Sequence, residues 1–209
     1  MTHIDLKSLI VKAGSEEGAR ILFQRLIGSI VRIFYKDARD IRCSPGDWGI
    51  DVLLGDIGGV VSVWQAKYFI HAVGNAQKSQ IRESFKTLMK RAEEQGFKVK
   101  AWTLCISCDL SPEETKWWEK WKKKAMRNHN LTIQLWDEGT IRTRLESPDA
   151  EHIREGYFGQ NPTILNCLNQ VMMQKRGRDN WLLPDWDFHP ARNIELLGAP
   201  EFMLSDTVG

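Results

Sequence analysis

Three side chains with complementary chemistry fall within one glycine-punctuated segment, GDWGIDVLLGDIGGVVSVWQAKYF, residues 46–69. Asp51 belongs to one stretch of strand character, and Gln65 and Lys67 belong to the next. Side chains two residues apart on a strand leave the same face, so Gln65 and Lys67 should point together. If the two strands pair across the glycine-rich turn, Asp51 meets both side chains at one end of a sheet.

The lysine on this apolar strand needs an anionic partner, because burying an unpaired ammonium group is costly. Asp51 and a metal-bound phosphate would supply one. A hard divalent cation prefers oxygen ligands, which Asp51, Gln65 and the Ala66 carbonyl can offer. Such an ion polarises a phosphate and acidifies a water, while Lys67 can orient that water and stabilise developing charge. Gly49 would let a phosphate backbone approach closely.

The elements that position these residues are predicted from periodicity, caps and turn residues. Ser15 and Ser111 are helix N-caps, with Glu114 closing a capping box, and Gly96 ends a helix. The short gaps between the first three strands imply an antiparallel meander, and strands joined through helices imply parallel neighbours. The sequence therefore predicts an α/β fold with a mixed sheet of four to five strands. Helices are expected at 15–35, 75–95, 112–128 and 138–145, and strands at 39–43, 49–54, 60–69, 99–107 and 132–136.

Three short motifs resemble the PD-(D/E)xK nuclease superfamily in its D-x(n)-Q-x-K form. They are GDWGID (46–51), WQAKYF (64–69) and QIRESF (80–85), and the resemblance covers roughly residues 10–146. The chain is similar above all to Mrr-like modules and to N-terminal endonuclease modules of bacterial antiphage proteins, such as CBASS effectors and STAND-type NTPases. The resemblance implies a restriction-endonuclease-like fold and metal-dependent cleavage of phosphodiester bonds.

The resemblance also implies roles for individual residues. Asp51 would be a metal ligand, Gln65 the variant of the usual acidic ligand, and Lys67 the catalytic lysine, with the Ala66 carbonyl as a further ligand. Many members add a glutamate from the first helix, for which Glu17 is the first candidate and Glu16 the fallback. The expected cofactor is Mg²⁺, with Mn²⁺ as a substitute. Glutamine at position 65 removes one negative charge from the site.

The expected substrate is double-stranded DNA, cut with little sequence preference, since no dedicated sequence-reading motif is present. Candidate DNA-binding residues lie on two predicted helices, although on the first of them a solvated helix face is the favoured explanation of these polar residues. For Trp117 and Trp121, packing on the sheet is favoured over stacking on bases. The candidates are Lys78, Gln80 and Arg82 on the first helix and Lys120, Lys123 and Lys124 on the second.

Residues 1–150 are expected to form the nuclease domain and residues 151–209 a C-terminal helix (161–174) with a linker-like extension (182–200). Such a nuclease needs control, and the resemblance implies a defence effector that forms a homo-oligomer or works with a fused or associated sensor. Two other hypotheses stay open. One is a catalytically weak or inactive nuclease-like domain that binds DNA or a partner protein, and the other is a structure-specific resolvase.

The overall composition neither demands nor excludes nucleic acid. The chain carries 29 lysines and arginines against 27 acids, so any basic surface must come from local clustering. There is no signal peptide pattern and no apolar stretch of membrane length, which favours a cytoplasmic protein without membrane partners. Cys105 and Cys108 have zinc-like spacing but should face opposite sides of a strand.

Overall fold

A computed structural model of the 209-residue chain describes residues 4–41 and 48–159. The chain divides into two units, Met1–Gln160 and Asn161–Gly209, and every described residue belongs to the first. The helix expected at 161–174, the extension at 182–200 and the end of the strand expected at 39–43 lie outside the described residues. The domain boundary expected at 150 stays a prediction.

The described unit is built on a five-stranded sheet with the order β1-β2-β3-β4-β5. The strands are β1 (Arg39–Asp40), β2 (Val52–Gly55), β3 (Val60–Lys67), β4 (Lys98–Ile106) and β5 (Thr132–Trp136). The first three strands pair antiparallel, and β3, β4 and β5 pair parallel. This confirms the predicted α/β class and mixed sheet flanked by helices.

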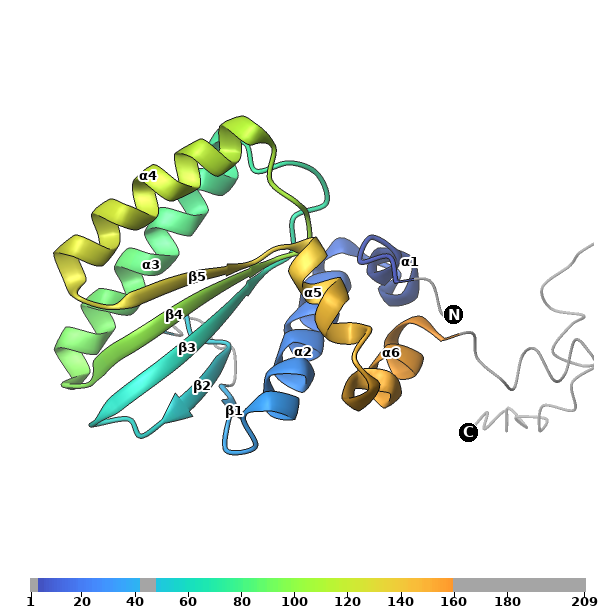
Figure 1. Ribbon diagram of the computed structural model, residues 1–209, viewed down its shortest axis with the longest axis horizontal. Helices are drawn as coiled ribbons and strands as arrows, with labels where there is room; N and C mark the ends of the chain where they lie inside the picture. Colours follow the sequence, from blue (N-terminus) through green and yellow to red (C-terminus); the bar gives the residue numbers. More distant parts are fainter. Residues whose placement is uncertain (1–3, 42–47, 160–209) are drawn as a thin grey trace, which may run out of the picture. The chain divides into compact units, whose positions relative to one another are not determined.

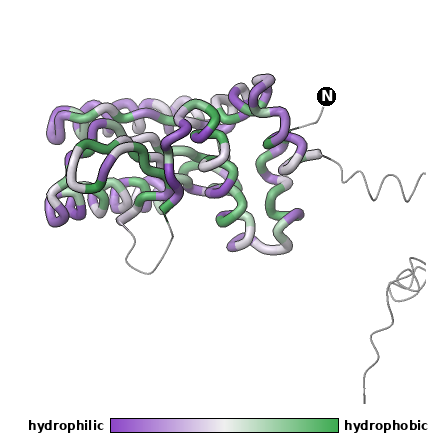
Figure 2. The backbone as a smooth tube through the Cα atoms, turned by 90° about the horizontal axis from the view of Figure 1, so that it is seen from below, coloured by the Kyte–Doolittle hydropathy of each residue, from purple (hydrophilic) through white to green (hydrophobic). Residues whose placement is uncertain are grey.

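Helices cover both faces of the sheet (Figure 1). Helices α3 (Asn75–Gln95) and α4 (Pro112–His129) lie on one face, and α2 (Glu16–Phe34) lies on the other with α1 (Ser8–Ala13), α5 (Glu138–Leu145) and α6 (Glu151–Phe158). Each interface has its own hydrophobic core, centred on Phe85 and Trp102 on the first face and on Phe23 and Trp64 on the second. The strands show long hydrophobic runs between amphipathic helices (Figure 2).

Local capping explains where the long helices begin and end. The Ser15 hydroxyl accepts the Gly18 N–H at 3.0 Å. Ser111 and Glu114 form the predicted capping box, in which the Glu114 carboxylate accepts the Ser111 N–H at 2.7 Å. Gly96 ends α3 in the left-handed conformation with φ of 74°. Such caps each stabilise a helix by about 1 kcal/mol, which is why these ends could be predicted from sequence.

One expected strand boundary is wrong, and two short helices were not predicted. The second strand begins at Val52, so Asp51 lies immediately before β2 and not on it. Helices α1 and α6 were not predicted within the described residues, because neither begins with a side-chain N-cap hydrogen bond like those of α2 and α4. Burial holds them in place, through Leu9 of α1 and Ile153 of α6, which both join the core around α2.

No helix in the described part of the chain is both long and apolar enough to cross a membrane.

Candidate functional site

Main-chain hydrogen bonds fix the position of Asp51 between two strands. Its N–H donates to the Trp64 carbonyl of β3 at 3.2 Å, and its carbonyl accepts the Ile41 N–H at 2.9 Å. Its side chain then turns toward the end of β3, where Oδ2 accepts the Ala66 N–H at 2.6 Å. Asp51 is half-buried, so its carboxylate is tethered at one end of the sheet but still reachable.

Gln65 and Lys67 lie on β3 as predicted, and their strand partners show which face they occupy. Gln65 is opposite Leu104 and Lys67 is opposite Ile106, both of which belong to the core beneath α3 and α4. Alternation along the strand therefore directs both side chains to the α3 side of the sheet. Gln65 is 97% buried, and its Oε1 is a buried atom with no hydrogen-bond partner.

Gly49 sits against Gln65 for a steric reason. Its φ of 70° lies in the left-handed region that favours glycine. A Cβ added there would stand 3.0 Å from Nε2 of Gln65 and 3.4 Å from the Ser84 carbonyl of α3. The glycine thus lets the chain pass close to the glutamine, whereas the sequence suggested room for a phosphate backbone.

One cavity of about 910 Å³ collects every residue of the predicted site, at the end of β3 between α2 and α3. Asp51, Gln65, Ala66, Lys67 and Glu17 all line it, together with the fallback residue Glu16. Residues that the sequence did not single out line it as well: Arg20, Gln24, His71, Gln77 and Glu83. Helical spacing could have found two of them, because Arg20 and Gln24 follow Glu17 by three and seven residues.

The cavity carries an excess of negative charge. Four carboxylates line it against two cationic side chains, Arg20 and Lys67. Glu17 in the first turn of α2 accepts a hydrogen bond from Arg20 at 3.0 Å, and both side chains are largely exposed. An exposed ion pair of this kind is worth at most about 1 kcal/mol, so Glu17 can exchange Arg20 for another cation.

The donor set around Asp51 fits a hard divalent cation. Among the described residues, no three His, Cys, Asp or Glu side chains converge as a metal cluster. The predicted set is of another kind, since it combines one carboxylate with the Gln65 amide oxygen and a main-chain carbonyl. The Ala66 carbonyl points to the same strand edge as its N–H, which donates to Asp51. Gln65 lines the same cavity, so a cation bound there would be a partner for its Oε1 once that atom turns toward the ion.

The two cysteines of β4 and its following loop face opposite sides, as predicted. Cys105 lies in the core around α2, and Cys108 lies in the core beneath α3 and α4. Burial raises the pKa of the Cys105 thiol well above its ordinary value, and the charge of Asp51 raises it further. Burial likewise raises the pKa of Cys108 to about 11. Both thiols are therefore protonated at neutral pH.

The candidate DNA-binding residues occupy different surroundings. Gln80 lines the cavity, while Arg82 is exposed on α3. Lys78 places its Nζ 5.4 Å from the ring centre of Trp117 on α4. The candidates on α4, Lys120, Lys123 and Lys124, are exposed.

The tryptophans of α4 pack against the sheet as expected, but the most deeply buried ring is a different one from those expected. Trp121 contacts Phe85 and Trp102 in the core, and Trp117 stacks on Trp121 with ring centres 6.1 Å apart. Trp118, which was not part of the predicted stripe, is the one fully buried, at 3% exposure. The rings therefore serve packing between α4, α3 and β4.

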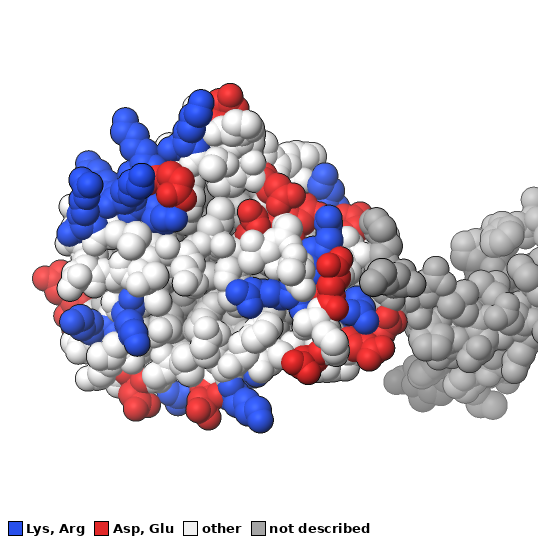
Figure 3. Space-filling model, in the orientation of Figure 1, with Lys and Arg blue, Asp and Glu red and all other residues white. Residues whose placement is uncertain are grey.

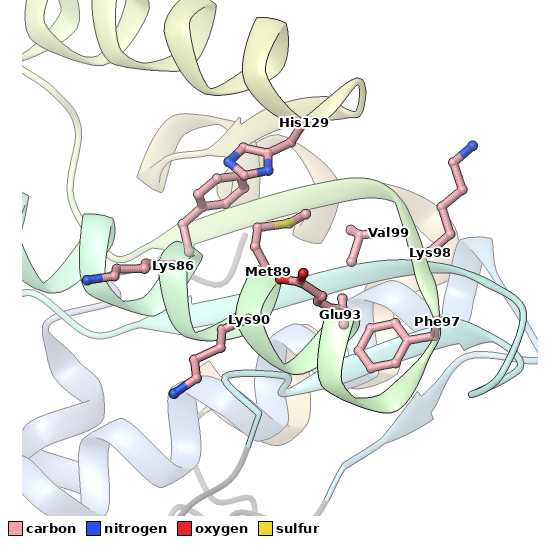
Figure 4. Close-up of a pocket in the computed structure, with 10 residues that line it drawn as sticks. Lys86, Met89, Lys90, Glu93, Phe97, Lys98, Val99 and His129 are labelled. Carbon is pink, nitrogen blue, oxygen red and sulfur yellow. The ribbon is translucent and has the colours of Figure 1, made fainter.

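A second hollow, of about 540 Å³, lies between the ends of α3 and α4 and the start of β4 (Figure 4). Its floor is apolar, with Met89, Phe97 and Val99, and the ammonium groups of Lys86 and Lys90 point away from it. It contains none of the predicted site residues.

No protein-family model matches the chain, and no curated protein matches it in sequence.

Proposed function

We propose that this protein is a magnesium-dependent DNA endonuclease of the PD-(D/E)xK type, built on a restriction-endonuclease-like core. One observation carries the proposal: Asp51 and Gln65 line one cavity at the end of β3, and Oε1 of Gln65 is buried without a hydrogen-bond partner. Leaving an acceptor unpaired costs about 1–3 kcal/mol, and a cation ligand role accounts for that cost. Lys67 lines the same cavity from the same strand face.

Each residue has a distinct task in this proposal. Asp51, Gln65 and the Ala66 carbonyl hold the ion, and Glu17 adds a carboxylate from α2 after exchanging its pairing with Arg20. The bound ion would polarise the scissile phosphate and acidify a water. Lys67 orients that water and offsets negative charge that develops on the phosphate. Arg20, once released, contacts a phosphate oxygen of the substrate.

Cleavage of supercoiled plasmid tests the proposal. The wild-type protein should nick or linearise plasmid with Mg²⁺ or Mn²⁺ and not with EDTA. Lys67→Ala should lose at least about a hundredfold in rate, as expected for loss of a group that stabilises transition-state charge. Lys36→Ala, an exposed residue after α2 outside the cavity, is the matched control and should cut at the wild-type rate. Activity that survives both EDTA and Lys67→Ala would refute the proposal.

A nuclease-like domain that binds DNA or a partner protein without cutting is the second candidate. The pairing of Glu17 with Arg20 favours it, because this carboxylate is already engaged while Gln65 contributes no charge. DNA binding without cleavage under every metal condition would support it. In either case we propose a role in antiphage defence, with control by a sensor module or by oligomerisation.

A further inference from the structure

Helix α4 carries a row of cations along its outer face. At about 100° per residue, all of them fall within a stripe about 100° wide, roughly opposite the buried Trp118. From Lys116 to Arg127 the stripe is roughly 16 Å long at 1.5 Å per residue. Figure 3 shows lysine and arginine side chains gathered over α4. We call these residues the α4 stripe; all are exposed, and they are Lys116, Lys120, Lys123, Lys124 and Arg127.

The stripe is electrostatically unbalanced. None of its cations makes an ion pair with an acid in the described part of the chain, whereas Lys122 of the same helix pairs with Glu119 at 2.9 Å. The acid on the same face, Glu113, lies in the first turn, where the helix dipole favours it. Like charges held in one row repel one another, and an anionic polymer relieves that repulsion. The stripe therefore fits a polyanion better than a single small anion.

The tryptophans decide which polyanion fits. Single-stranded nucleic acids bind through bases that stack on open aromatic rings. Here Trp118 is buried, Trp117 and Trp121 stack on each other, and Lys78 lies over Trp117. A cationic helix without an open stacking ring contacts phosphates. Its convex face fits the major groove of DNA, which is about 12 Å wide, and not the narrow major groove of duplex RNA.

The first half of α3 connects the stripe to the candidate site. Gln77 and Gln80 line the cavity, and Lys78 between them reaches across to Trp117 at the edge of the stripe. A duplex held on α4 can thus continue over α3 to the end of β3.

We infer that the α4 stripe is a docking surface for duplex DNA, which holds the phosphate backbone without sequence preference and directs the duplex toward the cavity. The inference rests on the proposed function, because delivery of DNA to the cavity has a purpose only if the cavity cleaves DNA. The binding itself needs neither the metal nor the cleavage step, so the two claims can fail separately.

Fluorescence anisotropy with a labelled 20-base-pair duplex in EDTA, over a range of salt concentrations, tests the inference. The test variant is the triple substitution Lys116→Gln, Lys120→Gln and Lys124→Gln, since glutamine keeps helix propensity. The control is Lys7→Gln, Arg25→Gln and Lys36→Gln, which removes the same charge from exposed positions on the α1 and α2 side. Circular dichroism verifies that both variants are folded.

Loss of three phosphate contacts should reduce the slope of log affinity against log salt by about 2.7. Affinity of the test variant should fall at least tenfold at 100 mM salt, and the control should stay within about twofold of wild type. Wild type should bind duplex DNA more tightly than single strands or duplex RNA of equal length. Equal losses in both variants, an unchanged test variant, or equal binding of single strands or duplex RNA would overturn the inference.

Lys67→Ala separates this inference from the proposed function. It should lose cleavage while its salt slope falls by no more than about 0.9, the value of one phosphate contact, against about 2.7 for the triple substitution. Wild type that binds duplex DNA through the stripe but cuts nothing would refute only the nuclease activity. Cleavage that persists at the wild-type rate with the stripe removed would refute only the docking surface.

Discussion

Replacing Gln65 with methionine should stabilise the metal-free protein. The Gln65 side chain is 97% buried and its Oε1 has no partner, which costs about 1–3 kcal/mol of desolvation. Methionine has a similar length and no such acceptor, and a hydrogen bond donated by the amide nitrogen, if lost, would offset about 0.5–1.5 kcal/mol of the gain. The net expectation is a gain of roughly 1 kcal/mol, or about 2–4 °C in Tm for a chain of this size.

The same substitution should remove the response to metal. A ligand that binds only the folded state at a hundred times its Kd stabilises it by about 2.7 kcal/mol. Wild-type protein should therefore gain several degrees in Tm on addition of Mn²⁺, and Gln65→Met should gain much less. Thermal unfolding in EDTA and in increasing Mn²⁺ measures both effects. Gln134→Met, at an exposed position of β5, is the matched control and should leave both quantities unchanged.

Two results would refute this reasoning. If Gln65→Met lowers stability by more than about 2 kcal/mol in EDTA, the amide makes an essential structural hydrogen bond. If the variant keeps the full gain from Mn²⁺, the amide oxygen is not a metal ligand.

Three further predictions follow from the geometry of the site and its surroundings. Gly49→Ala should lower the free energy of unfolding in urea by about 1–3 kcal/mol, because φ is 70° and the new Cβ meets a side chain at 3.0 Å; unchanged stability would contradict this. Glu17→Gln should weaken Mn²⁺ binding about tenfold, and Arg20→Ala should tighten it by freeing Glu17, as measured by calorimetry. If both variants bind Mn²⁺ with wild-type affinity, Glu17 is not a metal ligand. The free energy of unfolding should fall as pH rises above 9, because the unfolded thiols of Cys105 and Cys108 ionise there while the folded ones, with raised pKa, stay neutral. Urea titrations at pH 8 and pH 10 measure this loss of stability, which should be smaller in Cys105→Ala. If the variant loses as much stability as wild type, ionisation of Cys105 is not a cause of the loss.

Sequence was most informative where local interactions fix the structure. Helix α3 was predicted from residue 75 to residue 95, because apolar spacing runs to Ala92 and Gly96 supplies the left-handed cap. The capping box of Ser111 and Glu114 likewise marked the start of α4. The placement of Gln65 and Lys67 on one strand face followed from the two-residue period of a strand.

Sequence was least informative where distant segments meet. The break of the strand before Val52, which turns the Asp51 carboxylate onto the Ala66 N–H, depends on pairing across fifteen residues. The unpartnered oxygen of Gln65 depends on packing from β3, α3 and Gly49 together. Helical spacing from Glu17 could have indicated Arg20, but no local pattern indicates that His71 and Gln77 line the same cavity.

Diffraction from crystals soaked in Mn²⁺, with anomalous data collected, tests the central claim most directly. The account predicts one strong peak about 2.1 Å from both an Asp51 carboxylate oxygen and the Ala66 carbonyl oxygen, with Oε1 of Gln65 turned toward it. An empty cavity at saturating Mn²⁺, or an ion bound only elsewhere, would contradict the account.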